Sequence, residues 1–281
     1  MKSLLKEYVK AVIKEVYSTK DIDELSKTLE KIVTKYSHKL MTKSEHHLYH
    51  FMTREIIAKL SDMGFVLLGK GATREVYHRP QDPYVVKINS GSIGMSFLKR
   101  TPANKSEIDI GTGMHGLDAS SIVPKIIDYD RFYTEDPVWI IAEKVTTLED
   151  ANESDLQNIF PTFFSTFNSS VKDNIVYTIQ NIFSQTDGST PDELPIRQMR
   201  LQDFVDVYCD LVSFQYPEDE IDLNYIDQLR QGTVKPRDLQ KLLVCMKYVQ
   251  TADLHEENLG IRISSNPSPD DIVILDFDAN Y

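Results

Sequence analysis

Apolar residues recur every three or four positions along the first 62 residues, a spacing typical of amphipathic helices. The pattern predicts helices over residues 3–17, 21–36 and 44–62, with Ser44 as a suitable N-cap and Gly64 as a stop signal for the third. A piece this short has little core of its own, so we expect residues 1–62 to form a helical extension that packs on the following domain. The apolar residues of the third helix that need burial are Leu48, Phe51, Met52, Ile56 and Leu60.

After Gly64 the hydrophobic period shortens to two, which predicts strands. The run "FVLLGKGATREVYHRPQDPYVVKI" predicts three strands, joined by a Gly-rich turn and then by a Pro/Asp turn. A short helix is expected over residues 105–114. Two more strands are expected within "IVPKIIDYD" and "VWIIAEKV".

Residues 147–250 have a helical, Phe-rich pattern, which Pro161, "DGSTPDELP" and "GTVKP" interrupt. The tail "LGIRISSNPSPDDIVILDFD" predicts a β-hairpin with a turn of Pro, Ser and Asp. Strands in one part of the chain and helices in another predict an α+β protein.

Charge and length narrow the class of protein. The chain has 281 residues, 41% of them hydrophobic, which is enough for one large core or two smaller ones. The net charge is −12, and because residues 1–60 hold 12 Lys and Arg against 8 Asp and Glu, the remainder carries −16. An acidic bulk argues against nonspecific nucleic-acid binding. No apolar run approaches the ~20 residues that span a bilayer, so no membrane span is expected.

Cysteine content indicates the compartment. Only Cys209 and Cys245 are present, in apolar surroundings, and two cysteines make no disulfide framework for a chain of this size. Charges interrupt the N-terminus every three or four residues, unlike a signal peptide. We therefore expect a cytoplasmic protein.

The Gly-rich turn carries the first candidate motif. Gly69, Gly71 and Val76 fit the pattern G-x-G-x-x-G-x-V, except that Arg74 stands in place of the third glycine. Glycines between strands usually only make a turn. The alternative is a flap whose backbone closes over nucleotide phosphates, with Val76 packing on the base.

Lys87 is the second candidate. It lies among apolar β-branched residues in "YVVKI", where a lysine costs desolvation unless it finds an anion. One alternative is an edge-strand lysine that faces water. The other is a lysine that contacts phosphates and is held by Glu107, the natural partner in "NKSEIDIGTGM".

Polar residues crowd into "ADLHEENLGI", which fits D-L-x-x-x-N. This spacing can put a general base, Asp253, and a metal ligand, Asn258, on one loop. Asp276 follows the apolar run of "IVILDFDAN", where its carboxylate could also reach a metal ion. The alternatives are a solvated turn for the first stretch and a turn aspartate for the second.

The order of these motifs resembles that of the protein-kinase-like superfamily, over about residues 64–145 and 236–278. The resemblance implies a two-lobed fold, in which a small antiparallel β lobe of five strands and one helix holds ATP and Mg²⁺ against a helical lobe. The hinge would be "IIAEKV", with its backbone near Glu143 and Val145 hydrogen-bonded to adenine. The implied domains are 1–62, the helical extension, 63–145, the first lobe, and 146–281, the second.

Departures from the pattern indicate the branch. His255 stands where Ser/Thr protein kinases usually have lysine, so the loop looks more like those of aminoglycoside phosphotransferases and other atypical kinases. The resemblance implies that His255 contacts the γ-phosphate. Asp278 replaces the glycine of D-F-G, as an additional metal ligand or as a polar chain end. The sequence stops at Tyr281, so we expect a truncated second lobe without an activation segment.

The leading interpretation is an ATP- and Mg²⁺-dependent phosphotransferase whose other partner is an unidentified protein or small-molecule acceptor. The alternatives are a pseudokinase, which binds nucleotide or a protein without catalysis, and an enzyme that transfers AMP. The first 17 residues resemble the short charged N-terminal helices of some tailed-bacteriophage proteins. A phage source would imply the host cytoplasm.

Overall fold

The chain has an α+β fold that divides into two compact units. Residues 1–112 and 125–144 form the first unit, and residues 113–124 and 145–281 form the second. The computed structural model describes residues 20–37, 45–71, 74–89, 103–112, 119–133, 137–185, 195–248, 259–264 and 266–275. Among these residues, no helix is both long enough and apolar enough to cross a membrane.

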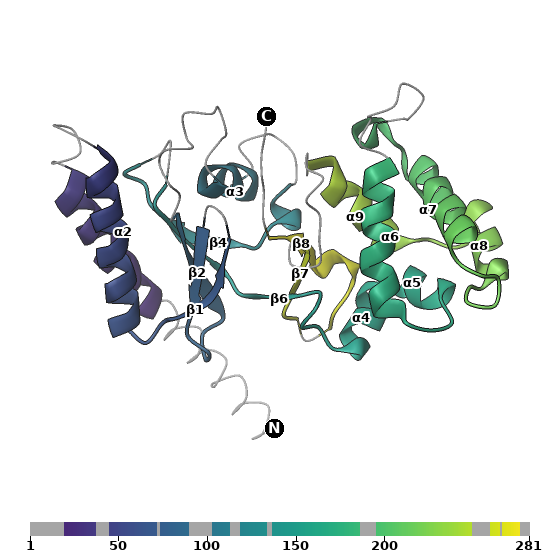
Figure 1. The fold of residues 1–281 in the computed structure, drawn as a ribbon, viewed down its shortest axis with the longest axis horizontal. Helices are drawn as coiled ribbons and strands as arrows, with labels where there is room; N and C mark the ends of the chain where they lie inside the picture. The colour runs from purple at the N-terminus through teal and green to yellow at the C-terminus, as the bar shows by residue number, and fades with distance from the viewer. Residues whose placement is uncertain are drawn as a thin grey trace, which may run out of the picture. The chain divides into compact units, whose positions relative to one another are not determined.

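The first unit combines helices with a five-stranded sheet (Figure 1). The strands predicted between residues 65 and 88 are confirmed, as are those within residues 122–130 and 138–145. In chain order the elements are the helix of residues 20–37, α2 (Glu45–Asp62), β1 (Val66–Lys70), β2 (Arg74–His78), β3 (Tyr84–Asn89), α3 (Ala103–Gly111), β4 (Ile126–Tyr129) and β5 (Trp139–Glu143).

The sheet is antiparallel throughout, with the order β1-β2-β3-β5-β4, so β3 is its central strand. Every residue of β3 is buried because both faces of the sheet are covered. Tyr84, Val86 and Ile88 pack in a core that includes the helix of residues 20–37 and α2. Val85 points to the opposite face and packs with Ile108 of α3. Figure 1 shows the two long helices on one side of the strands and α3 on the other.

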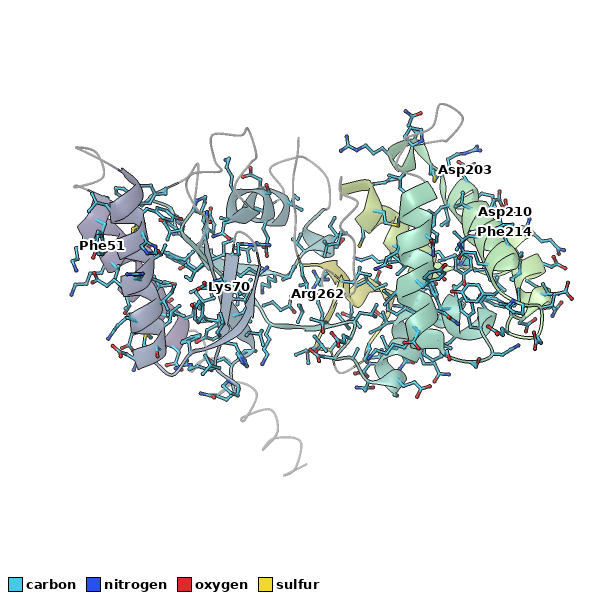
Figure 2. The ribbon with its side chains drawn as sticks, viewed as in Figure 1. Phe51, Lys70, Asp203, Asp210, Phe214 and Arg262 are labelled. Carbon is cyan, nitrogen blue, oxygen red and sulfur yellow. The ribbon has the colours of Figure 1, made fainter. Side chains whose placement is uncertain are left out.

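Helices are present over residues 20–37 and 45–62, as predicted, and they share one hydrophobic core with the sheet. Met52, Ile56 and Leu60 are fully buried there. Phe51 was expected on the same buried face and this expectation is wrong: its exposed fraction is 55%, and it lies on the outer side of α2 (Figure 2). One residue along a helix is a turn of about 100°, so burying Met52 carries Phe51 out of the core. Leu48 is half-buried.

Helix α2 ends as the sequence predicts. Gly64 has a φ of +82°, a left-handed conformation that glycine adopts without strain. The Leu60 carbonyl in the last turn accepts from the Met63 amide at 3.1 Å and from the Phe65 amide at 2.9 Å. This sharp reversal brings the chain directly into β1. The predicted N-cap, Ser44, and the predicted helix of residues 3–17 lie outside the described residues.

The second unit is a group of helices beside a three-stranded antiparallel sheet of order β6-β7-β8 (Figure 1). Both the helical region and the C-terminal hairpin were predicted and are confirmed. The elements are η2 (Ala119–Ile122), β6 (Val145–Thr147), α4 (Glu153–Ile159), α5 (Pro161–Thr166), α6 (Val171–Gln185), η3 (Ile196–Gln198), α7 (Leu201–Gln215), α8 (Leu223–Arg230), α9 (Arg237–Tyr248), β7 (Leu259–Arg262), η5 (Pro269–Asp271) and β8 (Ile272–Ile274).

Helix α9 precedes the predicted catalytic loop in the sequence, and polar contacts hold its first turns. The fully buried Asp238 accepts hydrogen bonds from the Thr162 amide at 2.8 Å and from the Thr162 hydroxyl at 2.5 Å. Burial raises the pKa of the Asp238 carboxyl, while these bonds from Thr162 favour its ionised form. One turn later, Lys241 Nζ donates to the Ser121 carbonyl at 2.8 Å.

The segment between α3 and β4 belongs to the second unit. Arg262, on β7, secures it by donating from Nη1 to the Ser121 carbonyl at 3.0 Å and from Nη2 to the Val123 carbonyl at 2.7 Å (Figure 2 labels Arg262). The chain therefore passes from one unit to the other at three places: after Thr112, after Pro124 and after Lys144.

Asp238→Ala is expected to lower the free energy of unfolding by about 2–3 kcal/mol, because it leaves two buried donors of Thr162 without their acceptor. Equilibrium unfolding in urea measures the change. Asp210→Ala is the matched control. Its carboxylate pairs with Arg230 at 2.7 Å but is 71% exposed, so its loss should cost less than about 1 kcal/mol. Equal costs for the two variants would contradict the structural role of Asp238.

Candidate functional site

Lys87 and Glu107 form the ion pair that the sequence predicts. Lys87 Nζ lies 2.5 Å from Glu107 Oε1, and the side-chain exposures are 6% and 0%. Lys87 stands on the central strand β3 and points to the face that α3 covers, because it shares its side of the strand with Val85. The alternative of an edge-strand lysine facing water is therefore excluded.

Arg74 binds the second oxygen of the same carboxylate. Its Nη1 lies 2.5 Å from Glu107 Oε2, and its side chain is also buried. In the β2–β3 ladder, Val76 stands opposite Lys87, so Arg74, two residues before Val76, is directed to the same face of the sheet. Glu107 thus receives one cation from each of two adjacent strands.

The Gly-rich turn joins β1 to β2. It is closed by a hydrogen bond from the Gly71 amide to the Arg74 carbonyl at 2.8 Å, and β1 has an irregular register between Leu67 and Gly69. A Cβ atom built at Gly69 would meet no other atom within 4 Å. The fold itself therefore does not need glycine at this position, whereas close approach of a ligand to the backbone would.

The other face of β2 has its own charged group. Glu75 lies 2.7 Å from Lys70 in an ion pair and accepts a hydrogen bond from the Tyr77 hydroxyl at 2.6 Å. The Lys70 hydrogen bond, and then that of Tyr77, lower the pKa of the Glu75 carboxyl. Alternate residues of β2 thus place Glu75 on the sheet face of Tyr77, which the helix of residues 20–37 and α2 cover, and Arg74 on the face of Lys87 and Glu107.

The predicted hinge residues stand at the end of β5 and the start of β6. The boundary between the compact units falls between Lys144 and Val145. The Glu143 amide donates to the Lys125 carbonyl at 2.9 Å, so this amide is already engaged. A bound adenine would have to use other backbone groups of the segment.

Five of the predicted site residues lie outside the described residues: Asp253, His255, Asn258, Asp276 and Asp278. The hairpin between them is described. Leu259 of β7 is paired with Ile274 of β8, so the chain enters the hairpin and leaves it at the same end. In the sequence, Asn258 directly precedes Leu259, and Asp276 follows Leu275.

The predicted metal site lies outside the described residues. Within them, no group of three or more His, Cys, Asp or Glu side chains could hold a metal ion. The three predicted metal ligands, Asn258, Asp276 and Asp278, all fall beyond the described ranges. Their oxygens are the ligand type that Mg²⁺ prefers.

Sequence reasoning missed the contact of Arg74 with Glu107. The sequence identifies Arg74 only as a departure from the glycine pattern. The available signal is its spacing: Arg74 and Val76 are two residues apart in one strand and share a face. Pairing Val76 with Lys87 across the hairpin would then have put Arg74 near Glu107.

Glu107→Gln is expected to lower the free energy of unfolding by about 3–5 kcal/mol, because it removes the carboxylate that two buried cations share. Lys87→Met should cost less, because Glu107 keeps its pairing with Arg74. Urea unfolding measures both. The control Glu55→Gln removes a more exposed carboxylate, paired with Lys35 at 2.7 Å, and should cost less than about 1 kcal/mol. If Lys87→Met costs as much as Glu107→Gln, Arg74 does not compensate for the lost lysine.

No protein-family model matches the chain, and no match was found among curated proteins. The functional argument therefore depends on the residues of the site itself.

Proposed function

We propose that the chain is an ATP- and Mg²⁺-dependent phosphotransferase with a protein-kinase-like fold, which transfers the γ-phosphate to a hydroxyl group of an acceptor. The observation that carries the proposal is the buried Lys87–Glu107 ion pair. It joins the central strand of a β1-β2-β3-β5-β4 sheet to the first described helix after that strand. In protein kinases, a strand lysine and a helix glutamate in this order must be paired for phosphates to be positioned.

Two further features of the first unit support nucleotide binding. The β1–β2 hairpin has open space at Gly69, where a backbone could approach phosphates closely. Val76 lies on the same sheet face as Lys87 and is only partly buried, so it offers apolar surface to a base. A triphosphate would interact with the Lys87 ammonium group, and Glu107 would keep that group oriented toward the phosphates.

In the proposed reaction, the acceptor oxygen attacks the γ-phosphorus and the bond from that phosphorus to the β–γ bridging oxygen breaks. Asp253 orients the acceptor hydroxyl and takes its proton, and ADP leaves. His255 would contact the γ-phosphate. The support for this arrangement is the sequence spacing from Asp253 to Asn258 and the hairpin that follows.

Asn258 and Asp276, with Asp278 as an additional candidate, would hold Mg²⁺. The chain enters and leaves the β7–β8 hairpin at one end, next in sequence to Asn258 and close to Asp276, which supports a shared site. When bound, the ion supplies positive charge that offsets the charge of the phosphates. An amide oxygen and carboxylates are suitable ligands for a hard cation.

A second candidate is a pseudokinase that binds nucleotide without transferring phosphate. The observation in its favour is Arg74, which stands in place of a glycine of the phosphate-covering turn and forms an ion pair with Glu107. Both candidates require nucleotide binding, so only a transfer assay separates them.

Wild-type protein incubated with γ-labelled ATP and Mg²⁺ is expected to transfer label to an acceptor, whereas α-labelled ATP should label nothing. Because general-base assistance is typically worth about 10²–10⁴-fold, Asp253→Asn should remove most transfer while MgATP binding remains. Asp276→Asn should instead weaken MgATP binding. Transfer of α-label would indicate AMP transfer. Binding of MgATP without transfer of either label would favour the pseudokinase.

Gly69→Ala should leave the stability of the ligand-free protein unchanged or slightly raised, because the added methyl group meets no protein atom. It should weaken MgATP binding by filling the space next to the backbone. A thermal-shift titration measures this: wild type at 100 times its dissociation constant gains about 2.7 kcal/mol, and the variant less at the same concentration. The control Gly232→Ala, at a φ of +68°, should lower basal stability and leave the MgATP shift unchanged. An undiminished shift in Gly69→Ala would count against phosphate binding at this turn.

A further inference from the structure

Arg74 makes a contact that the family pattern does not provide. Where that pattern has a flexible glycine, this chain has a side chain that turns inward and reaches the carboxylate of Glu107 at 2.5 Å. Lys87 reaches the other oxygen at the same distance. The two bonds use different oxygens, so neither cation displaces the other.

The register of the sheet makes this sharing possible. Val76 stands opposite Lys87, and Arg74 stands opposite Asn89, so the two cations are diagonal neighbours on adjacent strands. Two like charges at that spacing repel each other, and a carboxylate between them converts the repulsion into two attractions. Glu107 is fully buried, so these attractions are poorly screened by solvent.

Helix α3 is held to the first unit by this carboxylate, by its buried apolar residues and by a hydrogen bond from Asn104 Nδ2 to the Pro137 carbonyl at 2.8 Å. The helix has only nine residues. Its residue Ile108 belongs to the apolar cluster on this face of the sheet. One ion pair would leave the carboxylate free to rotate about its last bond. Two cations on two strands hold both oxygens in place. This pairing helps to determine which side of α3 faces the sheet.

We propose that Arg74 is a positioning residue, which holds Glu107 jointly with Lys87 and keeps α3 docked on the sheet when Lys87 engages a phosphate. The part that concerns the phosphate rests on the proposed function, whereas the docking of α3 does not. Arg74 acts through Glu107 and need not touch the ligand.

A double-mutant cycle on the full chain without nucleotide tests the docking. Hydrogen exchange of the α3 amides is measured in wild type, Arg74→Met, Lys87→Met and the double variant. Each single variant should raise exchange by less than about threefold, because one cation still holds Glu107, and the double variant by more than about tenfold. If the double variant exchanges no faster than Lys87→Met alone, Arg74 does not hold α3 and the proposal fails.

Lys70→Met is the matched control for the cycle. Lys70 lies next to the same turn but pairs with Glu75, and its side chain is 64% exposed. Combining it with Lys87→Met should add nothing to the exchange of α3. If it speeds the exchange as much as Arg74→Met does, the loss of any nearby positive charge explains the faster exchange, and the proposal is overturned. Should Arg74→Met not fold, Arg74→Gln replaces it throughout, with the same expected and contradicting results.

The catalytic test compares the change in the rate of phosphate transfer with the change in the KM for MgATP. Arg74→Met should slow phosphate transfer about tenfold, because Glu107 then orients Lys87 less precisely, with the KM for MgATP changed less than about twofold. Arg74→Lys, which keeps the charge, should recover most of the rate. An unchanged rate in Arg74→Met overturns the positioning role. If wild-type protein neither transfers phosphate nor binds MgATP, the proposed function fails, while the exchange cycle still decides whether Arg74 holds α3.

Discussion

The carboxylate of Glu107 is the point on which the first unit depends. It is fully buried, it carries one cation on each oxygen, and it joins a helix to two strands of the sheet. A buried charge is tolerated only when it is paired and hydrogen-bonded, so the three side chains constrain one another. The hydrophobic cores on the two faces supply most of the burial, and this polar group links α3 to β2 and β3.

Most of the architecture could be predicted because it follows from local patterns. Alternating apolar residues identify β2 and β3, and the helical period identifies the helix of residues 20–37 and α2. The pair of Lys87 and Glu107 could also be predicted, since a lysine flanked by apolar strand residues requires an anion. By contrast, Phe51 was assigned to the wrong face, because period alone does not settle which edge of an apolar stripe touches the core.

Features that depend on register or on long-range contacts could not be predicted. The inward direction of Arg74 requires the pairing of Val76 with Lys87, and a shift of one residue would send it to the other face. Residues 113–124 join the second unit through bonds such as that from Arg262 to Ser121, which are 141 residues apart, and no local pattern records such a contact. Asp253, Asn258 and Asp276 stay predictions, because they lie outside the described residues.

The second cation on Glu107 has an evolutionary consequence. In a protein where one lysine both serves the ligand and neutralises the buried carboxylate, losing that lysine harms activity and folding together. Here Arg74 also neutralises Glu107, so the stability of the fold does not depend on Lys87 alone. A descendant that loses Lys87 would keep Glu107 paired with Arg74 and remain folded, whereas loss of Glu107 would leave two buried cations without their anion and would be removed by selection.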